Sequence, residues 1–133
     1  MAKKKISRLK YKTTKKDFET FKRYCEWYID KLRVGNWRIY YEHEDPPDGV
    51  DKIADVEIDL ESEKVQITLY TRWHPLEVSD EAIQECAFHE IQHIRMARLM
   101  DLAGKRYIQE QDLEDAEHEV IRAHCHMHFS DLE

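Results

Sequence analysis

The sequence predicts one α+β domain in which an N-terminal helix, a three-stranded, mainly antiparallel sheet and two further helices follow one another. Three observations support this prediction. With 133 residues the chain is too short to form two separate hydrophobic cores. Hydrophobic residues make up 41% of it and charged residues 37%, which is enough for a packed core under a charged surface. Apolar side chains recur at helical spacing in some segments and alternate in others.

The first 16 residues form a basic segment, which we separate from the domain at residues 17–133. Before Asp17, the first acid, come eight of the chain's 21 Lys and Arg residues: Lys3, Lys4, Lys5, Arg8, Lys10, Lys12, Lys15 and Lys16. A block of like charges is most often a solvated tail, so we expect a disordered arm. Such an arm can also bind nucleic acid or an acidic partner by displacing counterions.

Composition excludes several classes of protein. The three glycines lie too far apart for a phosphate-binding loop, and the three cysteines include no Cys-x-x-Cys pair. No apolar run has the length of a membrane helix, and no apolar stretch of a secretory signal follows the basic N-terminus. We therefore expect no nucleotide-binding fold, no disulfide framework and no membrane contact, and a reducing, cytoplasmic location.

The first helix is expected over Asp17–Leu32, where apolar side chains recur every three or four residues. Thr14 or Asp17 suits its N-cap, and Gly35 suits a left-handed residue after its end. Three strands should follow, because apolar and polar residues alternate over 37–43, from about 53 to 59 and over 64–71. Their short connections indicate an antiparallel meander.

Two helices complete the domain. Ser79, followed by Asp80 and Glu81, has the signature of a helix start, and this helix should run to about Leu102, just before Gly104. The last helix is expected from about Gln111 to Phe129. Its apolar ridge consists of Leu113, Ala116, Val120, Ala123 and Met127.

The residues that point to chemistry lie in the middle of the helix from Asp80. The sequence His89-Glu90-Ile91-Gln92-His93 places two imidazoles four residues apart, on one face and one turn from each other, so that both can bind one metal ion. Glu90 lies about 100° around the helix from His89. It is poorly placed as a ligand and suited to accept a proton from water.

On a helical wheel the two histidines share a face with Ala82, Cys86, Ala97 and Met100. We therefore expect both imidazoles to point into the fold. Buried polar rings need partners, and a metal ion would satisfy them. Imidazole and carboxylate ligands suit zinc and several other divalent ions.

A catalytic zinc site needs a third protein ligand, which we expect from the last helix. Glu117 is the first candidate, because the wheel places it within the apolar face, where an acid needs a partner. A surface position for Glu117 is the competing interpretation. The further candidates are His124, Glu114, His118 and Glu119, of which His118 and Glu119 point away from the apolar face on the wheel.

The His-Glu-x-x-His sequence, followed by Glu117 on a second helix, resembles the gluzincin branch of the zincin metallopeptidases, and the small single-domain phage and bacterial members in particular. The resemblance implies a zincin-like fold in which His89, His93 and Glu117 bind Zn²⁺ and Glu90 activates water. It also implies a peptide or protein substrate that pairs along the strand at 64–71. The candidates for the family's oxyanion-stabilising group are Tyr107, His124 and His74.

Two alternatives stay open. The SprT-like branch, which acts in DNA transactions, uses a third histidine instead of the glutamate, and His118 or His124 would then bind the metal. The chain could also be a catalytically weak metal-binding module that contacts nucleic acid or a protein through residues 1–16. The sequence leaves the oligomeric state and the cleavage specificity open.

Overall fold

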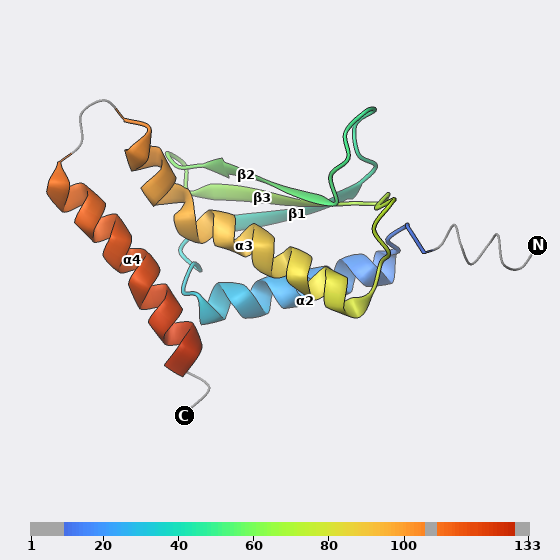
Figure 1. Ribbon diagram of the computed structural model, residues 1–133, viewed down its shortest axis with the longest axis horizontal. Coiled ribbons are helices and arrows are strands. Elements are labelled where there is room, and N and C mark those ends of the chain that lie inside the picture. Colours follow the sequence, from blue (N-terminus) through green and yellow to red (C-terminus); the bar gives the residue numbers. More distant parts are fainter. Residues whose placement is uncertain (1–9, 106–108, 130–133) are drawn as a thin grey trace, which may run out of the picture.

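The computed structural model describes residues 10–105 and 109–129 of the chain (Figure 1). It is an α+β structure in which helices α2 and α3 lie across one face of a three-stranded sheet and α4 packs on α3. In chain order the elements are α2 (Lys15–Lys31), β1 (Arg38–Glu44), β2 (Ala54–Asp59), β3 (Lys64–Tyr70), α3 (Asp80–Ala103) and α4 (Glu110–Phe129). The predicted order of elements is confirmed.

The sheet is mixed, and the predicted meander is wrong. The strand order is β1-β3-β2, with β3 parallel to β1 and antiparallel to β2. The expectation that β3 forms an edge of the sheet is therefore also wrong. The physical reason is burial: besides Val65, Ile67 and Leu69, the alternate residues Thr68 and Tyr70 are buried. The C-terminal half of β3 is therefore covered on both faces, which favours a central position in the sheet.

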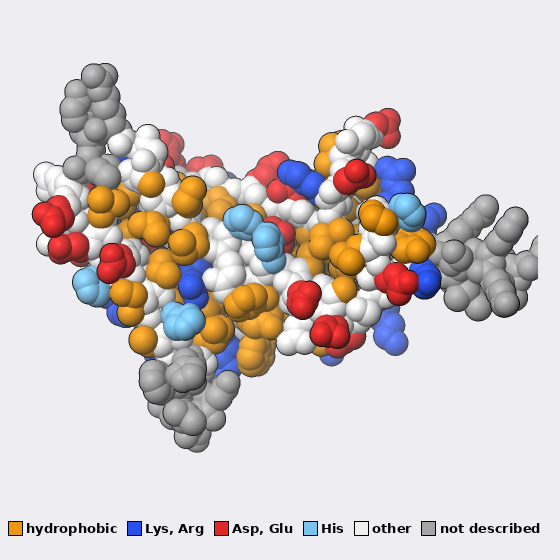
Figure 2. All heavy atoms as spheres, viewed as in Figure 1, with side chains coloured by type: hydrophobic (Ala, Val, Ile, Leu, Met, Phe, Trp, Pro, Cys, Tyr) orange, Lys and Arg blue, Asp and Glu red, His pale blue; other side chains and the backbone are white. Residues whose placement is uncertain are grey.

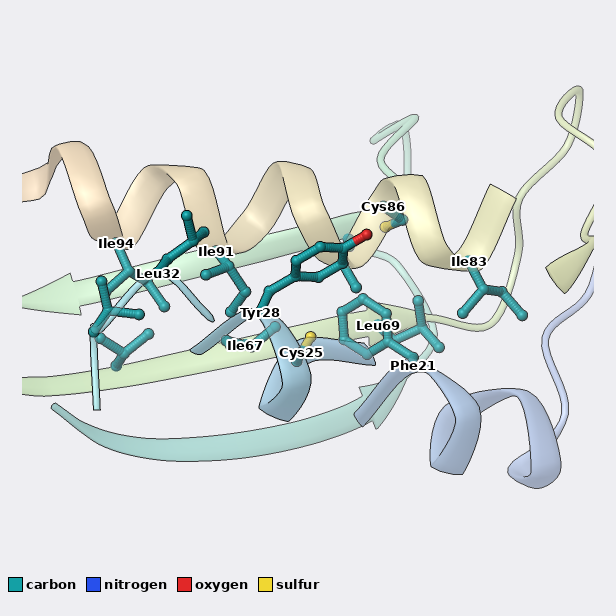
Figure 3. Packing of buried hydrophobic residues seen from close by; sticks show 14 of the residues in the cluster. Phe21, Cys25, Tyr28, Leu32, Ile67, Leu69, Ile83, Cys86, Ile91 and Ile94 are labelled. Atoms are coloured by element: carbon teal, nitrogen blue, oxygen red, sulfur yellow. The ribbon is translucent and has the colours of Figure 1, made fainter. Parts of the chain in front are cut away.

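The core lies between the sheet and the two helices on it. In Figure 3, side chains from α2, α3 and β3 meet in one layer. Those shown include Phe21, Cys25 and Tyr28 from α2, Ile83, Ile91 and Ile94 from α3, and Ile67 and Leu69 from β3. This layer fixes the rotation of α3 about its own axis, and with it the direction of every side chain on that helix.

Helix α2 begins with a capping box, because the Thr14 hydroxyl accepts a hydrogen bond from the Asp17 backbone N–H and the Asp17 carboxylate accepts one from Thr14 N–H. Both predicted cap residues thus take part. The prediction for the other end is wrong, since Arg33, with φ of 55°, adopts the left-handed conformation after the helix and Gly35 does not.

Part of the segment expected to be a free arm belongs to the fold. Thr13 is buried, and its hydroxyl donates to the Tyr70 carbonyl. Lys10 forms an ion pair with Glu77, and the Lys10 carbonyl accepts a hydrogen bond from Val78 N–H. Residues 10–14 therefore pack against the end of β3 and the segment before α3, and residues 1–9 lie outside the described part.

Helix α4 presents the predicted apolar ridge to α3. Ala116 and Ala123 are buried, and Leu113, Val120 and Met127 are half-buried. Small side chains at the contact let the two helix axes approach closely. Within residues 10–105 and 109–129, no helix has the length and apolar content needed to cross a membrane.

We expect Ile67→Ala to lower the free energy of unfolding by about 2–5 kcal/mol, because Ile67 is fully buried between the sheet and the helices and its loss leaves a cavity. The matched control is Tyr40→Ala on the neighbouring strand β1, where the side chain is 53% exposed and the cost should stay below about 1 kcal/mol. Urea unfolding followed by circular dichroism measures both values. Similar losses would contradict this location of the core.

Candidate metal centre

The candidate site is on α3, whose start is fixed by Ser79. The Ser79 hydroxyl accepts a hydrogen bond from Ala82 N–H, and Asp80 and Glu81 lie in the first turn, where acids favour the helix. The helix then continues for 24 residues, so that His89, Glu90 and His93 lie on a regular, well-supported segment. A site on a rigid helix holds its side chains more accurately than a site on a loop.

The two imidazoles converge. The Nε2 atoms of His89 and His93 are 3.2 Å apart, and the rings meet edge to face with centroids separated by 4.9 Å. Two nitrogens that each lie about 2.0–2.1 Å from one tetrahedral zinc are about 3.3–3.4 Å apart. The observed separation fits two ligands of a single ion.

The prediction that both imidazoles point into the fold is wrong, because His89 and His93 are exposed. The buried stripe of α3 instead runs through Ile83, Ala87, Glu90, Ile91, Ile94 and Ala97. Strand β2 is the last strand on this side of the sheet, so the histidine side of α3 stays open among the described residues. Figure 2 shows two neighbouring histidine side chains at the surface over the middle of α3.

Glu90 is the buried member of the motif, with 6% of its surface exposed. Burial, reinforced by the charge of Asp55 and opposed by Lys52, raises the pKa of the Glu90 carboxyl to about 7. A carboxyl with such a pKa exchanges its proton with water near neutral pH. That property suits a group that takes a proton in one step and returns it in the next.

A groove of about 700 Å³ between α3 and β2 contains all three motif side chains. Its walls come from the loop before β2, from β2, from the loop before α3 and from α3: Asp51, Lys52, Ile53, Ala54, Asp55, Val56, Leu76, Ala82, Glu85, Cys86, His89, Glu90 and His93. Burial raises the pKa of the Cys86 thiol, which therefore stays protonated and acts as an apolar part of the wall.

The inward position predicted for Glu117 is wrong, because its side chain is exposed on α4. The ridge by which α4 packs on α3 passes through Ala116, Val120 and Ala123, and Glu117 lies beside it, on the solvent side. Within the described ranges, no group of three or more His, Cys, Asp or Glu side chains has an arrangement that would hold a metal ion. The structure thus brings together His89 and His93 and leaves Glu117 apart from them.

The other candidates on α4 also lie elsewhere. Glu119 was expected to point away from α3, yet its carboxylate is 3.7 Å from the Arg98 guanidinium of α3. His118 contacts the carbonyl of Glu114 in its own helix, and His118, Glu114 and His124 are all exposed. These side chains are surface or interhelical residues here.

Of the candidates for an oxyanion-stabilising group, His74 packs against the Tyr11 ring and lines a second hollow next to the groove. His124 is exposed on α4, and Tyr107 lies outside the described residues. Sequence reasoning did not identify Asp55 and Lys52 as neighbours of Glu90. Only the position of β2 beside α3 reveals them, and no local pattern carries that information.

The comparisons with known proteins give no family assignment: no family model, no curated protein and no solved structure matches this chain. The side chains of the groove are therefore what indicates a function.

We expect Glu90→Gln to stabilise the metal-free protein at pH 8, by on the order of 3 kcal/mol, and to have little effect near pH 4.5. A buried acid whose pKa is raised from 4.5 to about 7 destabilises the fold once it ionises, so this penalty is absent below about pH 4.5 and complete above about pH 7. Urea unfolding in EDTA at the two pH values measures the difference. The exposed control, Glu85→Gln, should leave the free energy of unfolding nearly unchanged at both pH values. If Glu90→Gln raised the free energy of unfolding equally at both pH values, the burial of its charge would be contradicted.

Proposed function

We propose that this protein is a zinc-dependent peptidase that hydrolyses peptide bonds in the groove between α3 and β2. The observation that carries the proposal is the convergence of His89 Nε2 and His93 Nε2 at 3.2 Å beside a buried carboxyl whose pKa is about 7. Two metal-binding nitrogens and a proton acceptor within one groove are the parts that metal-assisted hydrolysis requires.

In this proposal the two imidazoles supply two of the three protein ligands that a catalytic zinc ion needs. His89 and His93 would hold the ion through Nε2, and zinc bound there would supply Lewis acidity for a carbonyl and for water. The third protein ligand, assigned to Glu117 by resemblance to the gluzincins, stays a prediction. Both imidazoles face open space in the groove, so further ligands can reach the ion from outside the helix.

Glu90 supplies the acid–base chemistry in this proposal. Its carboxylate accepts a proton from the attacking water and returns it to the leaving amine, two transfers that need a pKa close to the working pH. The side chain is held in the core-facing stripe of α3 between Ala87 and Ile94, so its direction is set by helix packing. Burial keeps the pKa of this carboxyl high, and Asp55 adds to the effect, because a neighbouring negative charge disfavours ionisation.

The substrate in this proposal is an extended peptide that adds to the outer edge of β2. The pairing assigned above to β3 is not available, because both of its neighbours are already in place. Strand β2, in contrast, pairs on one side with β3, and its other side is open among the described residues. An extended peptide gains main-chain hydrogen bonds at such an edge, which here runs along the groove with the two histidines.

We expect the full-length protein to bind about one zinc ion, and His89→Ala and His93→Ala each to weaken this binding by about 100-fold or more, because each removes one of only two converging nitrogens. Competition with a chromophoric zinc chelator measures the affinity. His118→Ala, an exposed histidine outside the groove, is the control and should bind like the wild type. Unchanged affinity in the His89 and His93 variants would refute the metal centre.

Glu90→Gln should keep the zinc affinity within about threefold of the wild type and lower the rate of peptide hydrolysis by about 100-fold or more, since an amide cannot accept the proton. Cleavage of an unstructured protein, followed by mass spectrometry, gives the rate. Glu81→Gln changes an exposed acid in the first turn of the same helix, outside the groove, and should remain active. Loss of zinc in Glu90→Gln would show that Glu90 is a ligand instead.

The prediction that Glu117 is the third zinc ligand is tested by a separate pair of variants. If Glu117 binds the ion, Glu117→Gln lowers the zinc affinity by about tenfold or more, whereas Glu114→Gln, an equally exposed acid on the same helix, leaves it unchanged. The same chelator competition measures both. Equal affinities would remove Glu117 from the ligand set and leave the two imidazoles as the protein's ligands from these helices.

A further inference from the structure

We propose that the groove along β2 selects extended peptides that carry apolar side chains on both sides of the histidine pair and a positive charge. This inference rests on the proposed function, of which it specifies the substrate class. It starts from the shape and lining of the surface around His89 and His93, which continues well beyond the motif.

The groove continues past His93 toward the C-terminal half of α3. A second hollow shares Val56 and His93 with the first, so that the two form one channel along β2. Its lining is largely apolar: Val56, Ile58 and Leu60 from β2 and the turn after it, and Ala97 and Met100 from α3. Val56, Ile58 and Leu60 are two residues apart, the spacing at which strand side chains share a face.

Apolar side chains also line the other end of the channel. Ile53, Leu76 and Ala82 lie there, on the far side of the histidine pair from Met100. Leu76 is 46% exposed and Met100 is 66% exposed. Figure 2 shows hydrophobic side chains on either side of the two central histidines. Large apolar side chains exposed at both ends of one channel mark a surface that another molecule covers.

The charges of the channel specify that molecule further. Its walls carry Asp51, Asp55 and Glu85 in addition to Glu90, against the single cation Lys52. The Lys52 ammonium lies 3.6 Å from the Asp55 carboxylate, so this cation is already paired. Neither Asp51 nor Glu85 forms an ion pair within residues 10–105 and 109–129. The channel thus attracts basic side chains and repels acidic ones.

The length of the peptide follows from β2. Six residues, Ala54–Asp59, form the strand, which at about 3.3 Å per residue is roughly 17–20 Å of extended chain. A peptide paired along this edge places every second side chain on one face, so two apolar side chains four residues apart can reach the two ends of the channel. The preferred ligand is therefore an apolar and basic segment of about six residues in extended conformation.

Binding of dye-labelled octapeptides to the metal-free, full-length protein tests this selection without hydrolysis. The reference peptide has Leu at positions 2 and 6, Lys at positions 4 and 8 and Ser elsewhere, so that all four side chains lie on one face of the extended strand. Two variants replace both Lys by Glu or both Leu by Ser. We expect each variant to bind about tenfold more weakly in fluorescence anisotropy, and the preference for Lys over Glu to shrink in high salt.

Variants of the protein locate the binding. Met100→Glu and Glu85→Lys should each weaken binding of the reference peptide by about fivefold or more, since they remove an apolar wall and an attractive charge. The matched controls are Ile121→Glu and Glu114→Lys, which change an exposed apolar side chain and an exposed acid of α4 that do not line the channel. All four positions are exposed, and circular dichroism confirms folding.

Equal affinity for the three peptides, no measurable binding, or equal effects of the variants and their controls would each overturn the proposed selection. The two proposals fail separately. Zinc-dependent hydrolysis without preference for apolar and basic segments overturns the selection and keeps the peptidase. Selective binding by a protein that never hydrolyses peptides keeps the selection and overturns the peptidase.

Discussion

The packing of α3 on the sheet is the constraint on which the candidate site depends. A helix repeats every 3.6 residues, so once Ile83, Ile91 and Ile94 are buried against the core, the direction of each remaining side chain is determined. Glu90 then lies within the buried stripe, and His89 and His93 lie at its margin, where β2 ends the sheet. A rotation of α3 by one residue would either bury His89 in the place of Glu90 or expose the Glu90 carboxyl in the place of His89, depending on its direction.

The buried carboxyl also shows how stability and chemistry compete at this site. An apolar residue in the place of Glu90 would pack against the core without a desolvation cost. The carboxyl weakens the fold when it ionises, and the same desolvation brings its pKa to about 7. Groups of this kind concentrate at functional sites, because ordinary core positions exclude them.

Local patterns in the sequence predicted the helices and strands but not the way in which they are arranged. The capping residues Thr14 and Ser79 fixed two helix starts, since a cap depends on neighbours three residues away. The placement of β3 between β1 and β2 depends on contacts far apart in the chain, and alternation within single strands does not contain them. The exposure of Glu117 was missed for a related reason. Its neighbour Ala116 is buried, and a small error in the predicted orientation of the helix is enough to place Glu117 on the buried face as well.

The open edge of β2 raises the problem of self-association, because an unpaired strand edge can pair with the same edge of a second molecule. Every second residue from Asp55 is an acid, with Glu57 and Asp59 following. In a pairing of two β2 edges, these carboxylates would meet carboxylates of the other copy, and like charges opposite each other destabilise a strand pair. The charge pattern of β2 thus opposes aggregation through this edge while leaving it open to chains of different composition.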